Sequence, residues 1–219
     1  MEILNILFYN FGMKKLLVSI FVLTMFLGNS AVYAATVKLP WKKEEQQVVV
    51  DQVSEQAKAL YAQNEIDEAL KLLKGKSEET RSAEDWLLIG NILQDKDKID
   101  EAVYMFKKSI EKDPKYYKAH YNLGYIYLIQ DKPNMALAEF KLAVKYKDDF
   151  AYGYYNMACA YLKLKQYRNA RYNFFRAMDL KGNEPNIYYN LAYTFKMLNK
   201  EKQAQTYLDI YNKMIESKQ

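Results

Sequence analysis

Two stretches of the chain, offset by 34 residues, decide the fold. Residues 86–106 read WLLIGNILQDKDKIDEAVYMF, and residues 120–140 read HYNLGYIYLIQDKPNMALAEF. Each begins with a bulky residue, has a glycine four positions later and an alanine twelve positions after the glycine, and ends on phenylalanine. Apolar residues recur within each half at the spacing of one helix face. Each stretch therefore predicts two amphipathic helices joined by a short turn.

The same spacing continues towards the C-terminal end of the chain. At intervals of 34 residues the glycine position is occupied by small residues, namely Gly90, Gly124, Ala158 and Ala192. The later alanine recurs at Ala102, Ala136, Ala170 and Ala204, and the large apolar residue recurs at Phe106, Phe140, Phe174 and Leu208. We expect the small residues to mark close helix crossings and the large residues to fill the space between repeats.

This pattern resembles the tetratricopeptide repeat, W-x2-L-G-x2-Y followed by A-x3-F and then proline. The resemblance implies an all-α fold, a right-handed superhelical solenoid of about five helix-turn-helix repeats. It places a repeat domain over residues 50–219, with the repeats at about 50–82, 83–116, 117–150, 151–184 and 185–218. The first repeat is the least regular, as is common where one side of a terminal repeat faces solvent.

Local signals predict where some of these helices begin and turn. Ser82 followed by Asp85 is typical of a capping pair at a helix start. Pro133 suits the first turn of a helix, where its missing N–H costs nothing. Asn64 and Asn199 stand where glycine is common between the two helices of a repeat, and we expect them to adopt the left-handed turn conformation.

The N-terminal residues predict a secretory signal peptide over residues 1–34. A short basic stretch after Met13 is followed by the apolar run 16–27, and a small-residue cleavage pattern ends at Ala34. We expect translation to start at Met13, and residues 35–49 to form a flexible lead-in to the repeats. An uncleaved membrane anchor is the alternative, although a bilayer span needs about 20 apolar residues.

The expected location is therefore outside the cytoplasm, in the periplasm, the extracellular space or the cell envelope. The net charge of +5 comes from lysine and acidic residues mixed along the chain, without a basic block, so nucleic acid is not an expected partner. Contact with a membrane is expected only through an uncleaved signal segment. The single Cys159 excludes an internal disulfide, and the single His120 excludes a His and Cys metal cluster. We expect no cofactor, and His120 and Cys159 as packed side chains.

No catalytic motif is present in the sequence. The chain has neither G-x-x-x-x-G-K-[ST] nor G-x-G-x-x-G. A nucleophile paired with histidine would have to use His120, which stands at a bulky core position of its repeat. Paired carboxylates are the remaining enzymatic alternative, but acidic residues here follow the solvent faces of helices. We therefore predict that the protein is not an enzyme.

The family resemblance implies a binding surface on the first helix of each repeat, which lines the concave side of such arrays. Carried onto this chain, it gives a partly tyrosine-lined groove made of Tyr121, Tyr125, Leu128, Tyr152, Tyr155, Leu162, Tyr189 and Tyr193. The lining is more polar in the second repeat. Tyrosine suits recognition because it combines a large ring with a hydroxyl and few rotors. Asn122, Asn156 and Asn190, beside these tyrosines, are expected to make local hydrogen bonds.

Three functions are compatible with this sequence. The favoured one is a scaffold that binds a peptide or protein segment in the groove and mediates protein–protein interaction in the cell envelope. The second is a structural protein that self-assembles into homo-oligomers through its last helix, which carries Tyr207, Tyr211, Met214 and Ile215. The third is a cell-wall glycan binder that stacks sugars on the tyrosines.

Overall fold

The computed structural model describes residues 51–181 and 184–217. The expected signal peptide, the expected start at Met13 and the lead-in over residues 35–49 lie outside this part of the chain. None of the helices within the described residues is both long and apolar enough to cross a membrane.

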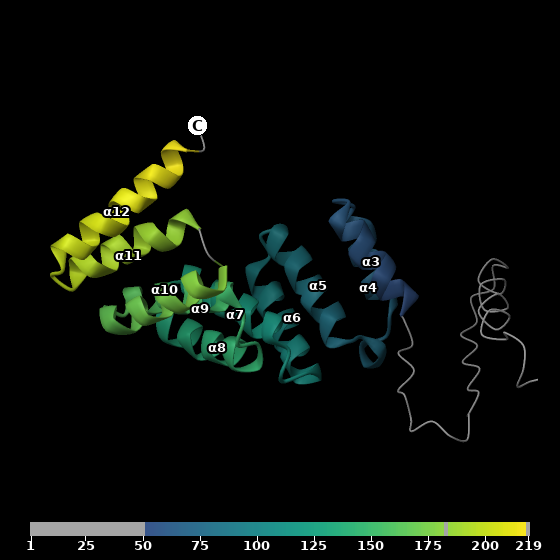
Figure 1. Cartoon of the computed structure of the whole chain (residues 1–219). Coiled ribbons are helices and arrows are strands. Elements are labelled where there is room, and N and C mark those ends of the chain that lie inside the picture. Colours follow the sequence, from purple (N-terminus) through teal and green to yellow (C-terminus); the bar gives the residue numbers. More distant parts are fainter. Residues whose placement is uncertain (1–50, 182–183, 218–219) are drawn as a thin grey trace, which may run out of the picture. The chain divides into compact units, whose positions relative to one another are not determined.

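The described residues form ten α-helices and contain no β-strand (Figure 1). In chain order the helices are α3 (Gln52–Ala62), α4 (Ile66–Gly75), α5 (Ala83–Asp95), α6 (Ile99–Lys112), α7 (Tyr117–Ile129), α8 (Pro133–Tyr146), α9 (Ala151–Lys163), α10 (Tyr167–Lys181), α11 (Pro185–Met197) and α12 (Glu201–Glu216). They pair into hairpins, and the second helix of each hairpin packs against the first helix of the next. The predicted all-α repeat architecture is confirmed.

The helix ends follow the local chemistry of the sequence. Ser82 accepts a hydrogen bond from the backbone N–H of Asp85, whose side chain accepts one from the N–H of Ser82, so the predicted capping pair is confirmed as a capping box. Pro133 occupies the first turn of α8, also as predicted. Helix α6 ends at Lys112 because Asp113 precedes Pro114, and proline disfavours a helical residue before it.

The hairpin turns each place one residue in the left-handed region. Asn64 and Asn199 have φ of 65° and 55°, as the sequence predicts. Asp97, Asp131 and Lys165 take equivalent places with φ between 56° and 58°. Asparagine and aspartate tolerate this conformation better than other non-glycine residues, so the turns are tight without glycine.

The core repeats with the same interval as the sequence pattern. Phe106, Phe140 and Phe174 are each completely buried. A Cβ on Gly90 would lie 2.5 Å from a ring carbon of Phe106, and one on Gly124 would lie 2.9 Å from a ring carbon of Phe140. The small residue is therefore required by the phenylalanine of the same repeat, which confirms the expected close crossing.

A buried ionic cluster holds the first repeat to the second. The ammonium group of Lys76, directly after α4, contacts the carboxylates of Asp51 and Asp85 and lies 2.7 Å from the hydroxyl of Ser54. Asp85 is 1% exposed. Burial raises the pKa of Asp85, but hydrogen bonds from Lys76, Ser54 and the N–H of Ser82 outweigh burial and lower it overall. The irregular first repeat is thus fixed by charge as well as by apolar packing.

Candidate functional site

The first helices of the repeats are joined to one another on one side, which we call the first-helix face. It is made by α3, α5, α7, α9 and α11. Helix α3 contacts α5, and α7 contacts α9. Side-chain hydrogen bonds join α5 to α7 and α9 to α11. The face is therefore one continuous surface that crosses all the repeats.

Asparagine amides connect the third, fourth and fifth repeats each to the repeat before it. The amide nitrogen of Asn156 donates to the hydroxyl of Tyr121 at 2.9 Å, and that of Asn190 donates to the hydroxyl of Tyr155 at 2.8 Å. Asn122 donates instead to the amide oxygen of Asn91 at 2.6 Å. The expectation of local hydrogen bonds for these three asparagines was wrong, because their partners lie one repeat away.

Tyr121 and Tyr155 are built into this junction. The ring of Tyr121 packs edge-on against Phe150, with 4.9 Å between centroids, and the ring of Tyr155 lies 5.7 Å from that of Phe174. Burial raises the pKa of Tyr155 to about 12, so its hydroxyl stays protonated at neutral pH. Each hydroxyl accepts from an asparagine, and that of Tyr155 also has a side-chain hydrogen bond with Cys159. These two tyrosines support the face from within.

Four other predicted tyrosines expose their rings on α7, α9 and α11 of the first-helix face. Tyr125 is 39% exposed, Tyr152 51%, Tyr189 53% and Tyr193 47%. Residues three or four positions apart on one helix share a face, so Tyr125 lies on the same side of α7 as Tyr121, and Tyr193 on the same side of α11 as Tyr189. These rings form an exposed apolar area on the first-helix face.

The two leucines of the predicted lining are placed differently. Leu128 is 7% exposed and belongs to the hydrophobic core, so its side chain is not on the lining; this part of the prediction needs correction. The stripe of exposed positions on α7 continues through Ile129, which is 57% exposed. Leu162 is half-buried and packs against the core of the last two repeats.

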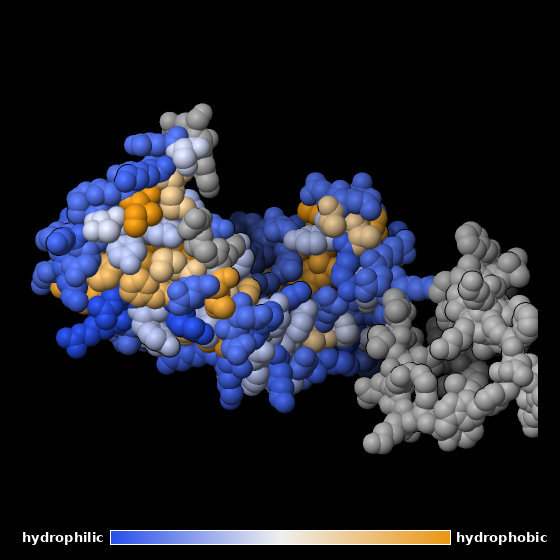
Figure 2. Space-filling model, viewed as in Figure 1, coloured by the Kyte–Doolittle hydropathy of each residue, from blue (hydrophilic) through white to orange (hydrophobic). Residues whose placement is uncertain are grey.

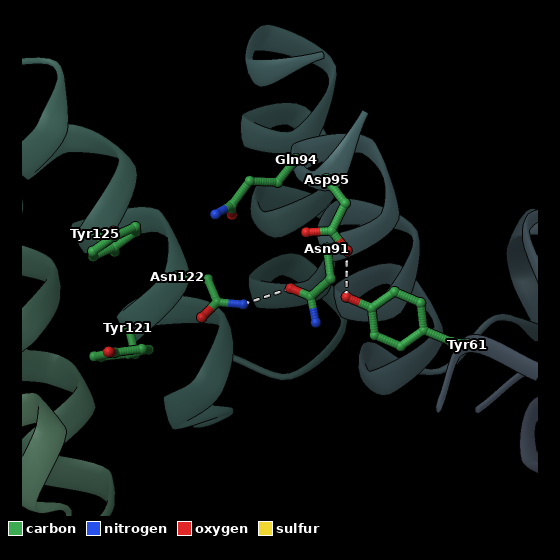
Figure 3. A pocket seen from close by; sticks show the side chains of 7 residues that line it. All are labelled: Tyr61, Asn91, Gln94, Asp95, Tyr121, Asn122 and Tyr125. Atoms are coloured by element: carbon green, nitrogen blue, oxygen red, sulfur yellow. Dashed lines mark hydrogen bonds between the residues drawn. The ribbon is translucent and has the colours of Figure 1, made fainter. Parts of the chain in front are cut away.

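A pocket of about 270 Å³ opens where three first helices meet (Figure 3). It is lined by Tyr61 from α3, by Asn91, Gln94 and Asp95 from α5, and by Tyr121, Asn122 and Tyr125 from α7. The hydroxyl of Tyr61 donates to the carboxylate of Asp95 at 2.6 Å. Burial and this carboxylate raise the pKa of Tyr61 to about 12. Tyrosine rings stand at both ends of the pocket, with the amides and the carboxylate between them (Figure 3).

A smaller hollow of about 80 Å³ lies farther along the face, between α9 and the start of α11. Its lining consists of Ala151, Tyr152, Tyr155, Glu184, Asn186 and Ile187. The two hollows are connected by packed rings, since Phe150 contacts both Tyr121 and Tyr152. Sequence reasoning missed Asn122 in the larger pocket and Ala151, Glu184 and Ile187 in the smaller hollow, because it assigned the lining by fixed positions on the first helix.

Cys159 lies within the face but is largely covered, as predicted. Burial raises the pKa of its thiol to about 12. The thiol is therefore protonated at neutral pH and a poor nucleophile, since the thiolate is the reactive form. The side chain behaves as a small apolar residue.

Comparison with known families identifies tetratricopeptide repeats in this chain. One tetratricopeptide repeat family model matches residues 105–138, and another matches residues 84–116 and 151–183. No curated protein has a sequence that matches this chain.

Similar solved structures include several of the protein MamA. MamA from residue 41 to its end, from Desulfovibrio magneticus RS-1, has a TM-score of 0.67 and 21% identity, over 75% of this chain and 94% of that chain. A double mutant of MamA RS-1 has a TM-score of 0.68 and 20% identity, over 76% and 94%. MamA MSR-1 has a TM-score of 0.66 and 17% identity, over 76% and 97%. At these identities the likeness concerns the fold alone.

Proposed function

We propose that this chain, an array of tetratricopeptide repeats, is an exported scaffold that binds a peptide or protein segment on its first-helix face. It would thereby mediate protein–protein interaction in the cell envelope. The observation that carries the proposal is the set of exposed rings on three consecutive first helices, at Tyr125, Tyr152, Tyr189 and Tyr193. Of these, Tyr125 lines the pocket and Tyr152 lines the smaller hollow.

The hydrogen bonds between repeats make this surface suitable for recognition. Because Asn156 and Asn190 connect consecutive repeats, the spacing of the first helices is held before any partner arrives. A surface that is already ordered loses less entropy on binding. Tyrosine adds contact area at a low cost in side-chain entropy. A chain segment lying across α5, α7 and α9 would meet amides and carboxylate first and aromatic rings next.

Crosslinking of partners in the native envelope tests this proposal. Tyr125→Ser/Tyr193→Ser removes two rings from the first-helix face. Tyr104→Ser/Tyr172→Ser is the matched control, since these tyrosines are 55% and 62% exposed on the second helices α6 and α10. Crosslinking in native envelope, followed by identification of captured proteins, should lose its products with the first pair and keep them with the second. Equal capture by both variants would reject the assignment of the face.

Export is supported by the sequence pattern of residues 13–34 and is tested separately. The N-terminal sequence of the protein recovered from cells is expected to begin at Ala35. A retained Met1 would refute both the start at Met13 and the cleavage.

Self-assembly by continued stacking is less well supported than partner binding. Ser109, Ala143 and Ala177 recur at intervals of 34 residues on α6, α8 and α10, and each is completely buried. The same position in α12 is Tyr211, whose ring lies 5.3 Å from that of Tyr189. A large ring therefore stands at a position that is small in the three preceding repeats, so the last hairpin departs from the pattern along which the others stack.

The last helices nevertheless keep an apolar surface. Figure 2 shows hydrophobic residues gathered over α10–α12 on the face in view. Ile210, Met214 and Ile215 of α12 are half-buried. Light scattering across a range of concentrations separates the two functions, because end-to-end association would raise the mass with concentration and a scaffold that works as a monomer would not.

A further inference from the structure

The two ends of the repeat array carry opposite charge. Residues 51–116, the first two repeats, contain 11 lysine and arginine residues against 15 aspartate and glutamate residues. Residues 117–219, the last three repeats, contain 16 against 9. The modest net charge of the whole chain therefore conceals an acidic part followed by a basic part.

The asymmetry is sharper on the first-helix face. Helices α7, α9 and α11 contain no aspartate or glutamate, and each contributes one lysine, namely Lys118, Lys163 and Lys196. All three lysines are exposed. On α3 and α5, by contrast, Lys58 is bound by both Glu55 and Glu84 at 2.7 Å, and Asp95 adds a further carboxylate. The face changes from acidic to basic where the exposed tyrosines begin.

The lysines stand beside the tyrosines. Lys118 is three residues before Tyr121 on α7, and Lys196 is three residues after Tyr193 on α11, so each pair lies on one side of its helix. Neither Lys118 nor Lys196 forms an ion pair within residues 51–181 and 184–217. Lys163 is bound by Asp131 at 2.7 Å. Two ammonium groups on the aromatic part of the face are thus available to a partner.

We propose that the segment bound on the first-helix face is acidic and carries aromatic or aliphatic side chains, with its carboxylates near Lys118 of α7 and Lys196 of α11. This inference rests on the proposed function and names the chemistry of the partner. Exposed rings take up apolar side chains, and flanking lysines attract carboxylates and disfavour basic competitors. The carboxylates of α3 and α5 repel the acidic part of the segment, which favours one direction of binding along the face.

A nucleic acid shares the negative charge but fits the face less well. A phosphate backbone is read by basic groups that follow it at short intervals. Here the available lysines are single residues on separate helices, and the face continues into Glu84 and Asp95, which would repel phosphates. Glu184 also brings a carboxylate to the edge of the smaller hollow. An acidic peptide can place its few carboxylates between these groups.

Selection from a random decapeptide library tests the inference with the full-length protein on beads. The retained peptides should be enriched in aspartate and glutamate together with aromatic residues. Lys118→Glu/Lys196→Glu should abolish this enrichment and weaken binding of a selected peptide about tenfold at low salt, the size expected for two exposed charge contacts. Lys107→Glu/Lys141→Glu is the matched control, because these lysines are exposed on the second helices α6 and α8 and the net charge changes equally.

Several outcomes overturn the inference. Retained peptides that are neutral or basic, no retained peptides, or equal loss with both lysine pairs would each reject an acidic partner. Displacement of the selected peptide by a random single-stranded DNA oligonucleotide, at comparable concentration, would assign the lysines to nucleic acid instead. If neutral peptides bind and Tyr125→Ser/Tyr193→Ser abolishes their binding, the acidic assignment fails while the proposed function stands. If the tyrosine pair has no effect on any bound peptide, the proposed function itself fails.

Discussion

The side-chain amide of Asn190 donates to the hydroxyl of Tyr155 at 2.8 Å, across the junction between the fourth and fifth hairpins. The ring of Tyr155 packs against Phe174 in the core of its own repeat. One side chain therefore takes part in packing inside a repeat and in the contact between two repeats. In an array where each repeat contacts only its neighbours, the stability of the folded chain depends on such contacts between adjacent repeats.

Tyr155→Phe should lower the free energy of unfolding by about 1 kcal/mol, the usual cost of a lost hydrogen bond that leaves its partner unsatisfied. The ring is kept, so the packing against Phe174 is unchanged and the loss reports on the bond from Asn190. Urea denaturation followed by circular dichroism measures it. Tyr193→Phe is the control, because this tyrosine is 47% exposed, and its change should stay within about 0.5 kcal/mol. Equal effects of the two variants would mean that the bond contributes nothing.

Gly90→Ala should destabilise the protein by roughly 1 kcal/mol. The added Cβ would lie 2.5 Å from a ring carbon of Phe106, and overpacking of this kind costs about 1–3 kcal/mol. Alanine recovers up to about 1 kcal/mol of helix propensity, so a net loss remains. The free energy of unfolding from urea denaturation checks this. The fourth repeat has Ala158 with Phe174 at the equivalent positions, so a hairpin can be built with alanine there. The size of the loss therefore reports how readily α5 and α6 move apart to make room for the methyl group.

A double-mutant cycle tests the stated cause of this loss. Phe106→Leu alone should destabilise by leaving a cavity. In the Gly90→Ala background it should cost less, because the smaller side chain gives the new methyl group room. The fifth repeat has this combination, Ala192 with Leu208, at the equivalent positions. Strictly additive effects would show that the methyl group and the ring do not compete for space.

The spacing of small and large residues predicted the helices and the core because each hairpin obeys the same local constraint. Gly90 must be small since Phe106 lies in its own repeat, and this is visible in the sequence. Leu128 and Asn190 behave differently because their surroundings come from neighbouring elements. Leu128 is buried in the core although its position was assigned to the lining, and the partner of Asn190 lies 35 residues away. A pattern within one repeat contains no information about these contacts.

Lys76→Met should destabilise the protein by about 3 kcal/mol at pH 7, because it leaves the carboxylate of Asp85 buried without its cation. The pKa of Asp85 is lowered in the folded state, so its contribution is present above its ordinary value of 3.8 and is lost as pH falls. The difference between wild type and variant should therefore shrink in acid, where Asp85 becomes protonated and needs no cation. Urea denaturation at neutral and acid pH measures it.

Lys74→Met provides the control for this prediction, since Lys74 is exposed on α4 and the same charge is removed. Its effect should be small at both pH values. A Lys76→Met variant as stable as the control would mean that the cluster contributes nothing to stability. A difference that grows in acid would contradict the assigned role of Asp85.

The buried His120 should make the protein less stable in mild alkali. Its Nδ1 lies 2.7 Å from the carboxylate of Glu139, and its Nε2 lies 3.0 Å from the carbonyl oxygen of Pro114. Both partners are acceptors, so only the imidazolium form can donate to both. Burial lowers the pKa of His120, but these two hydrogen bonds outweigh burial and raise it overall.

The direction of the pH effect follows from this raised pKa. The stabilisation is complete below the ordinary value of 6.5 and is lost as pH rises through the raised value. The melting temperature should therefore fall as the pH is raised from mildly acidic to mildly alkaline. His120→Gln should remove this slope, since the chain has no other histidine. Glu139→Gln should move the midpoint to lower pH, whereas a midpoint below 6.5 in the wild type would show that burial of the ring outweighs its two acceptors.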